Sequence, residues 1–144
     1  IGHRSVAGAQ PMLDFQSFPM AEATKAVNNA TLTVLMLETP TAIRNANDIA
    51  SVEGVDCLLI GTNDLCMEMG IPGELDHPEI MEAYKQTITA CTKHGKFVGM
   101  GGVYNFDAMR VYIDMGVQLV LAGNDLNFMI SAGREQTNKL RSLA

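Results

Sequence analysis

The chain has 144 residues, of which 47% are hydrophobic and 18% charged, and its formal net charge is −6. This balance is typical of a folded globular protein with a sizeable core, and it excludes a largely disordered chain. The ten Lys and Arg residues are scattered along the sequence, which argues against a general nucleic-acid binder, because neutralising phosphates takes clustered cations.

The opening segment is irregular. The chain starts at Ile1, not Met, in what reads as the middle of a loop, and we therefore expect it to be a piece of a longer protein. Gly and Pro residues interrupt any period up to about Thr31, and only residues 20–29 are expected to form a short helix. We expect this segment to run over the surface between two secondary-structure elements.

From residue 31 onward, short apolar runs alternate with amphipathic segments, the pattern of βα units around a parallel sheet. The runs are continuous in hydrophobicity, as in parallel strands that are buried on both faces. The predicted strands are residues 32–37, 57–61, 97–100 and 118–122. The predicted helices are residues 41–50, 78–94, 106–115 and 126 to about 143.

The helix predicted for residues 78–94 has the best-marked boundaries. Pro78 stands at its start, and Gly95 follows its end as a C-cap. Its core face is predicted from residues at the three-to-four spacing of a helix turned to a sheet: Ile80, Tyr84, Ile88 and Cys91.

Three cysteines indicate the cellular setting. Cys57, Cys66 and Cys91 form neither a CxxC pair nor an even disulfide set, so we expect reduced core thiols in a cytoplasmic protein. No apolar run approaches the roughly twenty residues that span a bilayer, and no charged-then-apolar leader opens the chain. We expect a soluble protein that is not secreted and that binds no membrane.

Two predicted strands are each followed by an acidic residue, Glu38 in one case and Asp64 in the other. A charge beside a buried strand is costly unless something pairs with it, and the carboxyl ends of parallel strands share one edge of the sheet, where ligands bind. If the two strands are neighbours, about 4.8 Å apart, both carboxylates project into one small volume. With no Cys or His beside the pair, Mg²⁺ or Mn²⁺ is favoured over Zn²⁺ as the cation that the two carboxylates would share.

The residue types alone leave a second interpretation open. Asp64 could cap a short helix, and Glu38, just before Thr39 and Pro40, could favour the dipole of the next helix. The glycine-rich ends of the last two strands, residues 99–102 and 122–125, likewise read either as an anion site or as tight turns with Asn124 or Asp125 as N-cap.

These segments resemble the HpcH/HpaI aldolase/citrate lyase family, the class II metal-dependent aldolases that cleave 4-hydroxy-2-oxo acids. The resemblance rests on the Glu38-Thr39 strand end, the Glu-Gly-Val-Asp of residues 53–56 and the Ile-Gly-x-x-Asp-Leu of residues 60–65, followed by residues 77–79, 95–96 and 116–118. It runs from about residue 31 to the end, in the right order and spacing. The opening Gly2-His3-Arg4 resembles the family loop that precedes this region.

The resemblance implies a (β/α)₈ TIM barrel of the phosphoenolpyruvate/pyruvate type. Residues 1–144 would form a single domain fragment, the C-terminal four βα units, with the N-terminal half absent. The metal ligands would be Glu38 and Asp64, holding Mg²⁺ or Mn²⁺, with Co²⁺ also possible. The small-molecule 2-oxo acid substrate would lie against the metal, close to Met36 and to the turn formed by Gly61, Thr62, Asn63 and Asp64.

Two positions depart from the family pattern. Many members carry Pro-Ala where this chain has Thr62-Asn63, which need not disturb a backbone contact. In well-known members a substrate-contacting Gln lies two residues before the metal-binding Glu, and here that position is Met36, which cannot donate a hydrogen bond. The aldehyde partner and the exact 2-oxo acid are therefore left open.

The implied reaction is cleavage to pyruvate and an aldehyde through a metal-stabilised enolate. No lysine lies in a predicted strand, which agrees with the absence of an imine mechanism. The family's catalytic His and Arg come from the N-terminal half, so we expect no catalytic residue within this chain and no activity from it alone. His3, His77 and His94 are not expected to replace them.

Two alternatives remain open. One is related metal-enolate chemistry, such as oxaloacetate decarboxylation or acyl-CoA lyase activity. The other is a non-catalytic half-barrel interaction protein whose carboxylates merely cap helices. In either case we expect a homo-oligomer, because half a barrel leaves unpaired strand edges and the last predicted helix carries a run of apolar residues: Leu126, Phe128, Met129 and Ile130.

Overall fold

The structure is a computed structural model that describes residues 11–143, and the chain divides into two compact units, Ile1–Thr33 and Val34–Ala144. In the first unit, the 3₁₀ helix η1 (Pro11–Leu13) precedes helix α1 (Met20–Ala30). The short helix predicted for residues 20–29 is confirmed to within one residue. The predictions for His3, and for the family-like loop that contains it, lie outside the described residues.

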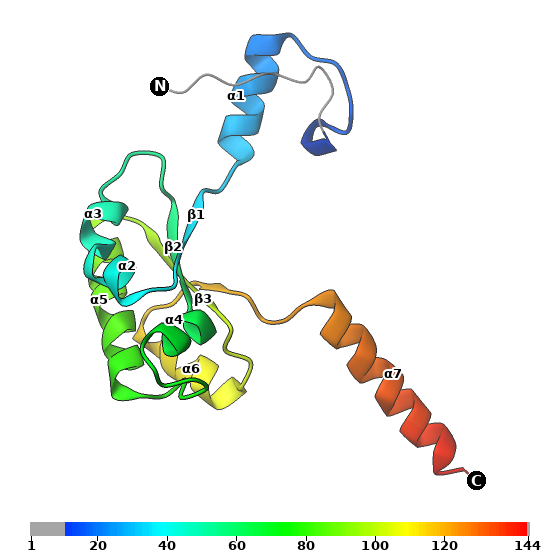
Figure 1. The fold of residues 1–144 in the computed structure, drawn as a ribbon. Helices are drawn as coiled ribbons and strands as arrows, with labels where there is room; N and C mark the ends of the chain where they lie inside the picture. The colour runs from blue at the N-terminus through cyan, green and yellow to red at the C-terminus, as the bar shows by residue number, and fades with distance from the viewer. Residues whose placement is uncertain (1–10, 144) are drawn as a thin grey trace. The chain divides into compact units, whose positions relative to one another are not determined.

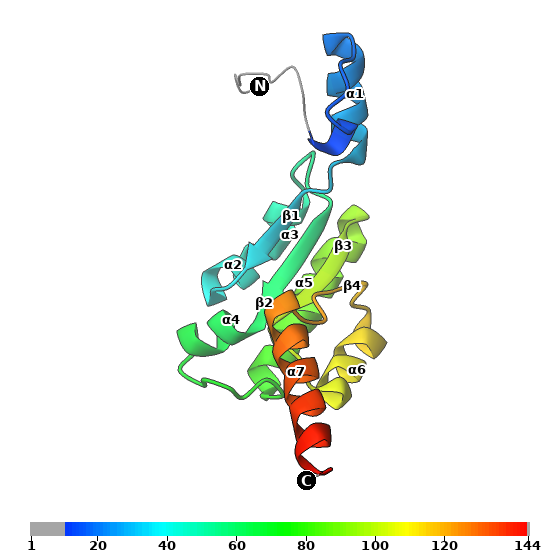
Figure 2. The same ribbon diagram turned by 90° about the vertical axis from the view of Figure 1, so that its right-hand side faces the viewer.

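The second unit contains a four-stranded sheet in the order β1-β2-β3-β4, in which all pairs are parallel (Figures 1 and 2). Its strands are β1 (Val34–Leu37), β2 (Cys57–Gly61), β3 (Phe97–Gly101) and β4 (Leu119–Val120). Strands that follow one another in the chain are therefore neighbours in the sheet. The predicted α/β class with a parallel sheet is confirmed.

The two outer strands of the described sheet are shorter than predicted. β1 begins at Val34 instead of residue 32, and β4 spans two residues of the predicted 118–122. Backbone hydrogen bonds of 2.9 Å from Gln118 N to the Val98 carbonyl and from Leu121 N to the Met100 carbonyl nevertheless continue the pairing on both sides of β4.

The connecting helices of the second unit are α2 (Pro40–Arg44), α3 (Ala46–Ala50), α4 (Thr62–Glu68), α5 (Pro78–His94), α6 (Phe106–Met115) and α7 (Asp125–Arg141). The single helix predicted for residues 41–50 is wrong in one respect. It is two short helices that meet at Asn45, whose backbone (φ −91°, ψ 4°) lies in the bridge region between helix and turn.

Helix α5 has the predicted boundaries. The side chain of His77 caps its start by accepting a hydrogen bond from the Glu79 N–H at 3.2 Å. Gly95 ends it in the left-handed conformation, with φ of 64°. On its predicted core face Ile80, Tyr84 and Cys91 are fully buried, and the helix packs along β2 and β3 (Figure 1).

The two faces of the sheet carry different side chains. Leu58 and Ile60 of β2, with Val98 and Met100 of β3, belong to the core that the helices cover. The alternate residues point to the opposite face, where the side chain of Leu59 lies across Gly99; a Cβ on Gly99 would stand 3.0 Å from the Leu59 Cβ. The close approach of Leu59 therefore depends on the missing side chain of Gly99.

Cys57, Cys66 and Cys91 are free thiols and fully buried, as predicted. In the ordinary range of pH they are neutral, because burial raises the pKa of each thiol. They are core residues, and none lines the cavity at the strand ends described below.

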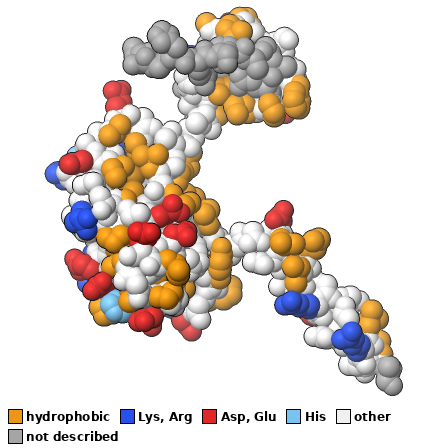
Figure 3. Space-filling model, viewed as in Figure 1, with side chains coloured by type: hydrophobic (Ala, Val, Ile, Leu, Met, Phe, Trp, Pro, Cys, Tyr) orange, Lys and Arg blue, Asp and Glu red, His pale blue; other side chains and the backbone are white. Residues whose placement is uncertain are grey.

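Helix α7 differs from the others because none of its residues is buried. Its start is capped by Asn124, whose side chain accepts a hydrogen bond from the Asn127 N–H at 2.9 Å, so the N-cap interpretation of residues 122–125 is confirmed. Figure 3 shows hydrophobic side chains exposed along this helix. The exposed apolar residues of α7 include Leu126, Phe128 and Met129. Over residues 11–143, no helix combines the length and the apolar character needed to cross a bilayer.

Candidate metal and substrate site

The carboxyl ends of β1, β2 and β3 meet at one edge of the sheet. The register pairs Leu37 of β1 with Ile60 of β2, and Gly61 of β2 with Gly101 of β3. Continuing the first pairing by one residue places Glu38 beside Gly61. The acid that follows β1 thus stands next to the turn that leads from β2 to Asp64.

Glu38 lies directly over Gly61. A Cβ on Gly61 would stand 2.8 Å from Cγ and 3.0 Å from Oε1 of Glu38, and 3.3 Å from the sulfur of Met36. The φ of Gly61 is −80°, which any residue adopts. A side chain on residue 61 would therefore displace the carboxylate of Glu38, so the position of this carboxylate depends on glycine.

Asp64 lies in the first turn of α4, three residues after the N-cap Gly61. Its exposed side chain borders a cavity of about 230 Å³ at the strand ends. The cavity is lined by Met36, Gly61, Thr62, Asn63, Asp64, Gly101, Gly102, Tyr104 and Leu121. All five residues predicted to contact the substrate therefore border one cavity, and Glu38 reaches its edge over Gly61.

The interpretation of the two acids as helix caps fits Asp64 better than Glu38. Helix α2 is capped by Thr39, whose Oγ1 accepts a hydrogen bond from the Ala42 N–H at 3.1 Å, and Glu38 lies outside the first turn of this helix. Asp64 does lie in the first turn of α4, where the helix dipole favours a negative charge, but no side chain caps this helix. The residue that caps α2 is therefore Thr39, and not Glu38 as the alternative interpretation predicted.

The turn between β2 and α4 is held by two side-chain hydrogen bonds. The hydroxyls of Thr62 and Tyr84 lie 2.7 Å apart, with either able to donate, and both residues are fully buried. On the other side, Asn63 Nδ2 donates to the carbonyl of Gly102 at 3.1 Å. Gly102 has a φ of +83°, and a Cβ there would stand 2.9 Å from Asn63 Nδ2, so this contact also needs glycine.

Behind Thr62, the rings of Tyr84 and Tyr112 stack with centroids 3.9 Å apart and an interplanar angle of 23°. The hydroxyl of Tyr112 donates to the carbonyl of Leu75. Burial raises the pKa of Tyr112 to about 12 and raises that of Tyr84 well above its usual range. Both hydroxyls therefore stay neutral at physiological pH and keep their hydrogen bonds.

The donors at this edge fit a hard divalent cation. Mg²⁺ and similar ions take oxygen ligands and often keep several waters, so one or two protein carboxylates suffice together with the oxygens of a substrate. Glu38 and Asp64 supply two carboxylates. No group of three or more His, Cys, Asp or Glu side chains that could hold a metal occurs within residues 11–143, so any further ligands here would come from water, backbone or substrate.

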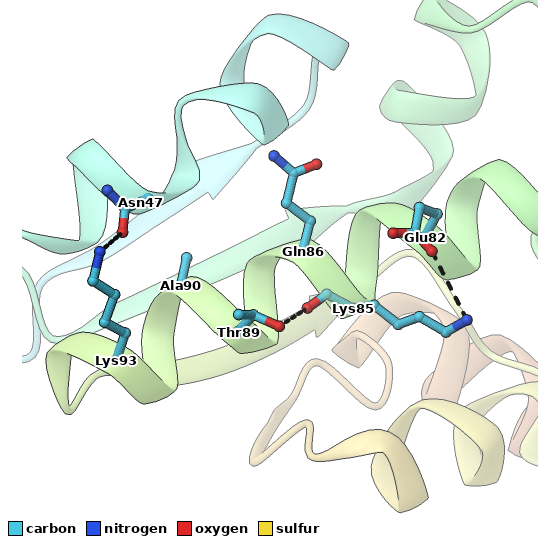
Figure 4. Close-up of a pocket in the computed structure, with 7 residues that line it drawn as sticks. All are labelled: Asn47, Glu82, Lys85, Gln86, Thr89, Ala90 and Lys93. Carbon is cyan, nitrogen blue, oxygen red and sulfur yellow. Dashed lines mark hydrogen bonds and ion pairs between the residues drawn. The ribbon is translucent and has the colours of Figure 1, made fainter.

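The histidines that the structure describes have other roles. His77 caps α5, and His94 at the end of the same helix has Nε2 3.1 Å from Asn47 Oδ1. Lys93 also donates to this oxygen, at 2.9 Å. The contact between Lys93 and Asn47 borders a second cavity of about 410 Å³ between α3 and α5 (Figure 4), which shares no lining residue with the cavity at the strand ends. As predicted, no lysine of the described residues lies in a strand.

Sequence reasoning did not find Tyr104 or Leu121, which also line the cavity. Both follow shortly after the ends of β3 and β4, so their position relative to those ends is the signal that could have found them. Their contribution depends on the register between β2, β3 and β4, which the sequence pattern does not supply.

The sequence of the chain matches a known protein family. A sequence profile described as HpcH/HpaI aldolase/citrate lyase matches residues 8–132. The chain is 31% identical over 145 residues to a 4-hydroxy-4-methyl-2-oxoglutarate aldolase of Hapsidospora irregularis, covering 99% of this chain and 54% of that protein. It is 33% identical over 108 residues to a 5-keto-4-deoxy-D-glucarate aldolase of Shigella boydii, covering 74% and 42%.

Solved structures agree. An HpcH/HpaI aldolase from Desulfitobacterium hafniense superposes with a TM-score of 0.81 at 24% identity, covering 99% of this chain and 55% of that one, a likeness of fold. A family protein from Burkholderia cenocepacia superposes with a TM-score of 0.76 at 27% identity, covering 97% and 53%. The chain spans about half the length of the relatives it matches. The chain belongs to the HpcH/HpaI aldolase/citrate lyase family.

Proposed function

We propose that the protein containing this chain is a metal-dependent aldolase that cleaves a 4-hydroxy-2-oxo acid to pyruvate and an aldehyde. The observation that carries the proposal is the placement of two acids at one edge of the sheet: Glu38 lies over Gly61, and Asp64, in the first turn of α4, lines the same cavity as Gly61. Relatives named as aldolases of 2-oxo acids support the same reaction class.

We further propose that residues 1–144 are the C-terminal half of a (β/α)₈ barrel. Three features support this: the strands are all parallel and in chain order, each outer strand pairs with one other strand within residues 11–143, and the chain spans about half the length of its relatives. The sheet face opposite the helices, which carries Met36, Leu59 and Leu121, would then line the barrel interior.

In this proposal Glu38 and Asp64 hold the divalent ion, Mg²⁺ or Mn²⁺ with Co²⁺ also possible. The bound ion would supply Lewis-acid polarisation of the 2-oxo group. Backbone groups of the turn from Gly61 to Asp64 orient the substrate carboxylate, while Met36 offers an apolar contact. The proton-transferring His and the Arg come from the N-terminal half.

The non-catalytic alternative requires the acids to serve only as helix caps. Its premise is weakened at Glu38, because Thr39 caps α2. Oxaloacetate decarboxylation uses the same metal-bound 2-oxo acid, and the experiment below separates it from aldol cleavage.

The test is a screen of 2-oxo acids with the full-length protein, with added Mn²⁺ and with a chelator. We expect pyruvate and an aldehyde from at least one 4-hydroxy-2-oxo acid, and loss of the reaction when the metal is removed. Pyruvate formation from oxaloacetate alone would reassign the activity to decarboxylation. Turnover that a chelator leaves unchanged would contradict the metal proposal.

The exposed apolar residues of α7 support a homo-oligomer in which this helix packs on a second copy. Light scattering of the full-length protein tests this. A wild-type oligomer that dissociates when Phe128 and Met129 are replaced by Ser would support it, and a monomeric wild type would contradict it.

The buried, unpaired cysteines support a cytoplasmic location, which remains a prediction.

A further inference from the structure

We propose that Tyr84 is a positioning residue for the metal site, holding through Thr62 the turn that presents Asp64. The inference rests on the proposed metal site, and it assigns to a residue of helix α5, buried behind the sheet edge, a part in setting metal affinity. It predicts that one hydroxyl outside the cavity controls how tightly the cavity binds a cation.

The connection is short and buried. Thr62 directly follows β2 and begins α4, and Asp64 comes two residues later in the same turn. The Thr62 hydroxyl is 2.7 Å from that of Tyr84, and neither residue is exposed to solvent. No side chain caps the start of α4, so this bond is the polar tie between the first turn of the helix and the core, beside the apolar packing of Leu65 and Cys66.

A second bond holds the opposite side of the turn. Asn63 donates to the carbonyl of Gly102, beyond the end of β3. The turn is therefore fixed between α5 and the loop after β3. If the bond to Tyr84 is removed, the Asn63 contact is the one that remains of these two side-chain hydrogen bonds. The burial of Leu65 and Cys66 still holds α4 against the core, so we expect the fold to persist while the carboxylate of Asp64 is held less firmly relative to Glu38.

Tyr84 is itself well fixed. Its ring is stacked on that of Tyr112, a contact between the rings that does not involve the Tyr112 hydroxyl, which bonds to the carbonyl of Leu75. Positioning of this kind matters because a binding site loses affinity when the groups that orient its ligands are loosened. The buried position also keeps water from replacing the lost hydroxyl.

The experiment is a titration of the full-length protein with Mn²⁺, in which electron paramagnetic resonance measures the concentration of free Mn²⁺. Thermal unfolding of the metal-free protein is measured in parallel. Tyr84→Phe and Thr62→Val each remove one hydroxyl of the bond, whereas Thr62→Ser keeps it. Tyr112→Phe is the matched control: it removes an equally buried tyrosine hydroxyl that does not reach the turn.

We expect Mn²⁺ affinity to fall roughly tenfold in Tyr84→Phe and Thr62→Val, and to stay within about twofold of wild type in Thr62→Ser and Tyr112→Phe, although Tyr112→Phe lowers thermal stability. The double variant Thr62→Val with Tyr84→Phe leaves no unpaired hydroxyl in the core, so it retains the fold if a single variant does not. It should show the same loss of affinity as either single change.

Equal destabilisation by Tyr84→Phe and Tyr112→Phe with unchanged Mn²⁺ affinity would overturn the proposal and leave both hydroxyls with a structural role only. A double variant that binds Mn²⁺ as tightly as wild type would also overturn it. A wild-type protein that binds Mn²⁺ in this way but cleaves no 2-oxo acid would refute the proposed function alone. A wild type that binds no Mn²⁺ would refute both proposals.

Discussion

The carboxylate of Glu38 lies across the bare backbone of Gly61 on the neighbouring strand. The space that a Cβ on Gly61 would fill is already occupied, with Cγ and Oε1 of Glu38 at 2.8 and 3.0 Å from that position. This relationship joins the acid after β1 to the cavity at the end of β2. At this position the backbone would accept any residue, and glycine leaves the room that the Glu38 carboxylate occupies.

Gly61→Ala is expected to weaken metal binding by tenfold or more, because the new methyl group displaces the Glu38 carboxylate. Overpacking should also lower the free energy of unfolding by about 1–3 kcal/mol. Mn²⁺ titration and urea unfolding of the full-length protein measure both quantities.

Gly99→Ala is the matched control for this change. Its methyl group would meet Leu59 at 3.0 Å on the same face of the sheet, without touching either acid. We expect a similar loss of stability and unchanged Mn²⁺ affinity. If both variants lose affinity equally, the effect of Gly61→Ala is one of general packing, and the role given to its contact with Glu38 is wrong.

Met36→Gln is expected to shift substrate preference. Met36 is about half exposed, at 51%, and lines the cavity, so an amide there gains a donor that can reach the substrate. We expect the ratio of kcat/KM values between hydroxyl-rich and apolar aldehyde moieties to rise about tenfold. Met36→Leu, which adds no donor, should keep the wild-type ratio. An unchanged ratio in both variants would remove Met36 from the substrate contacts.

Replacement of His77 or His94 by Ala is expected to leave kcat within about twofold of wild type, since neither lines the cavity at the strand ends. His77→Ala should lower the free energy of unfolding by about 1 kcal/mol, because α5 loses its N-cap acceptor. Steady-state assays and urea unfolding test the two statements. A hundredfold loss of kcat in either variant would restore that histidine as a catalytic candidate.

Alkaline pH is expected to destabilise the fold through its buried thiols. Burial raises the pKa of Cys91 from 9.0 to about 11. Because the folded value lies above the unfolded one, this thiol stabilises the fold fully below pH 9, and the contribution is lost as pH rises through about 11. Urea unfolding at pH 8, 9, 10 and 11 should show a smaller loss of stability between pH 9 and 11 in Cys91→Ala than in wild type. Identical pH profiles would contradict the assignment.

Elements with strong local signals could be predicted from the sequence. Helix α5 begins and ends where Pro78 and Gly95 indicated, and strand β2 has the predicted limits. The break at Asn45 was missed, because apolar residues continue across it and no Gly or Pro marks the interruption. Strand β4 was predicted too long, because its hydrophobic run says nothing about how much of it finds a partner.

The residues of the candidate site that lie next to strand ends in the sequence could be predicted. Met36 and the turn from Gly61 to Asp64 border one cavity because parallel strands bring their carboxyl ends together. The bond between Thr62 and Tyr84 joins residues 22 positions apart, and the contact of Asn63 with Gly102 spans 39. Such contacts depend on packing between elements, which a residue pattern along one chain does not encode.

Glu38 and Asp64 are proposed to hold one divalent ion together. The most direct measurement is Mn²⁺ titration of the full-length protein beside its Glu38→Gln and Asp64→Asn variants, which keep size and shape while removing one charge each. We expect one Mn²⁺ per wild-type chain and a loss of affinity of about a hundredfold or more in either variant. Wild-type stoichiometry and affinity in both variants would contradict it.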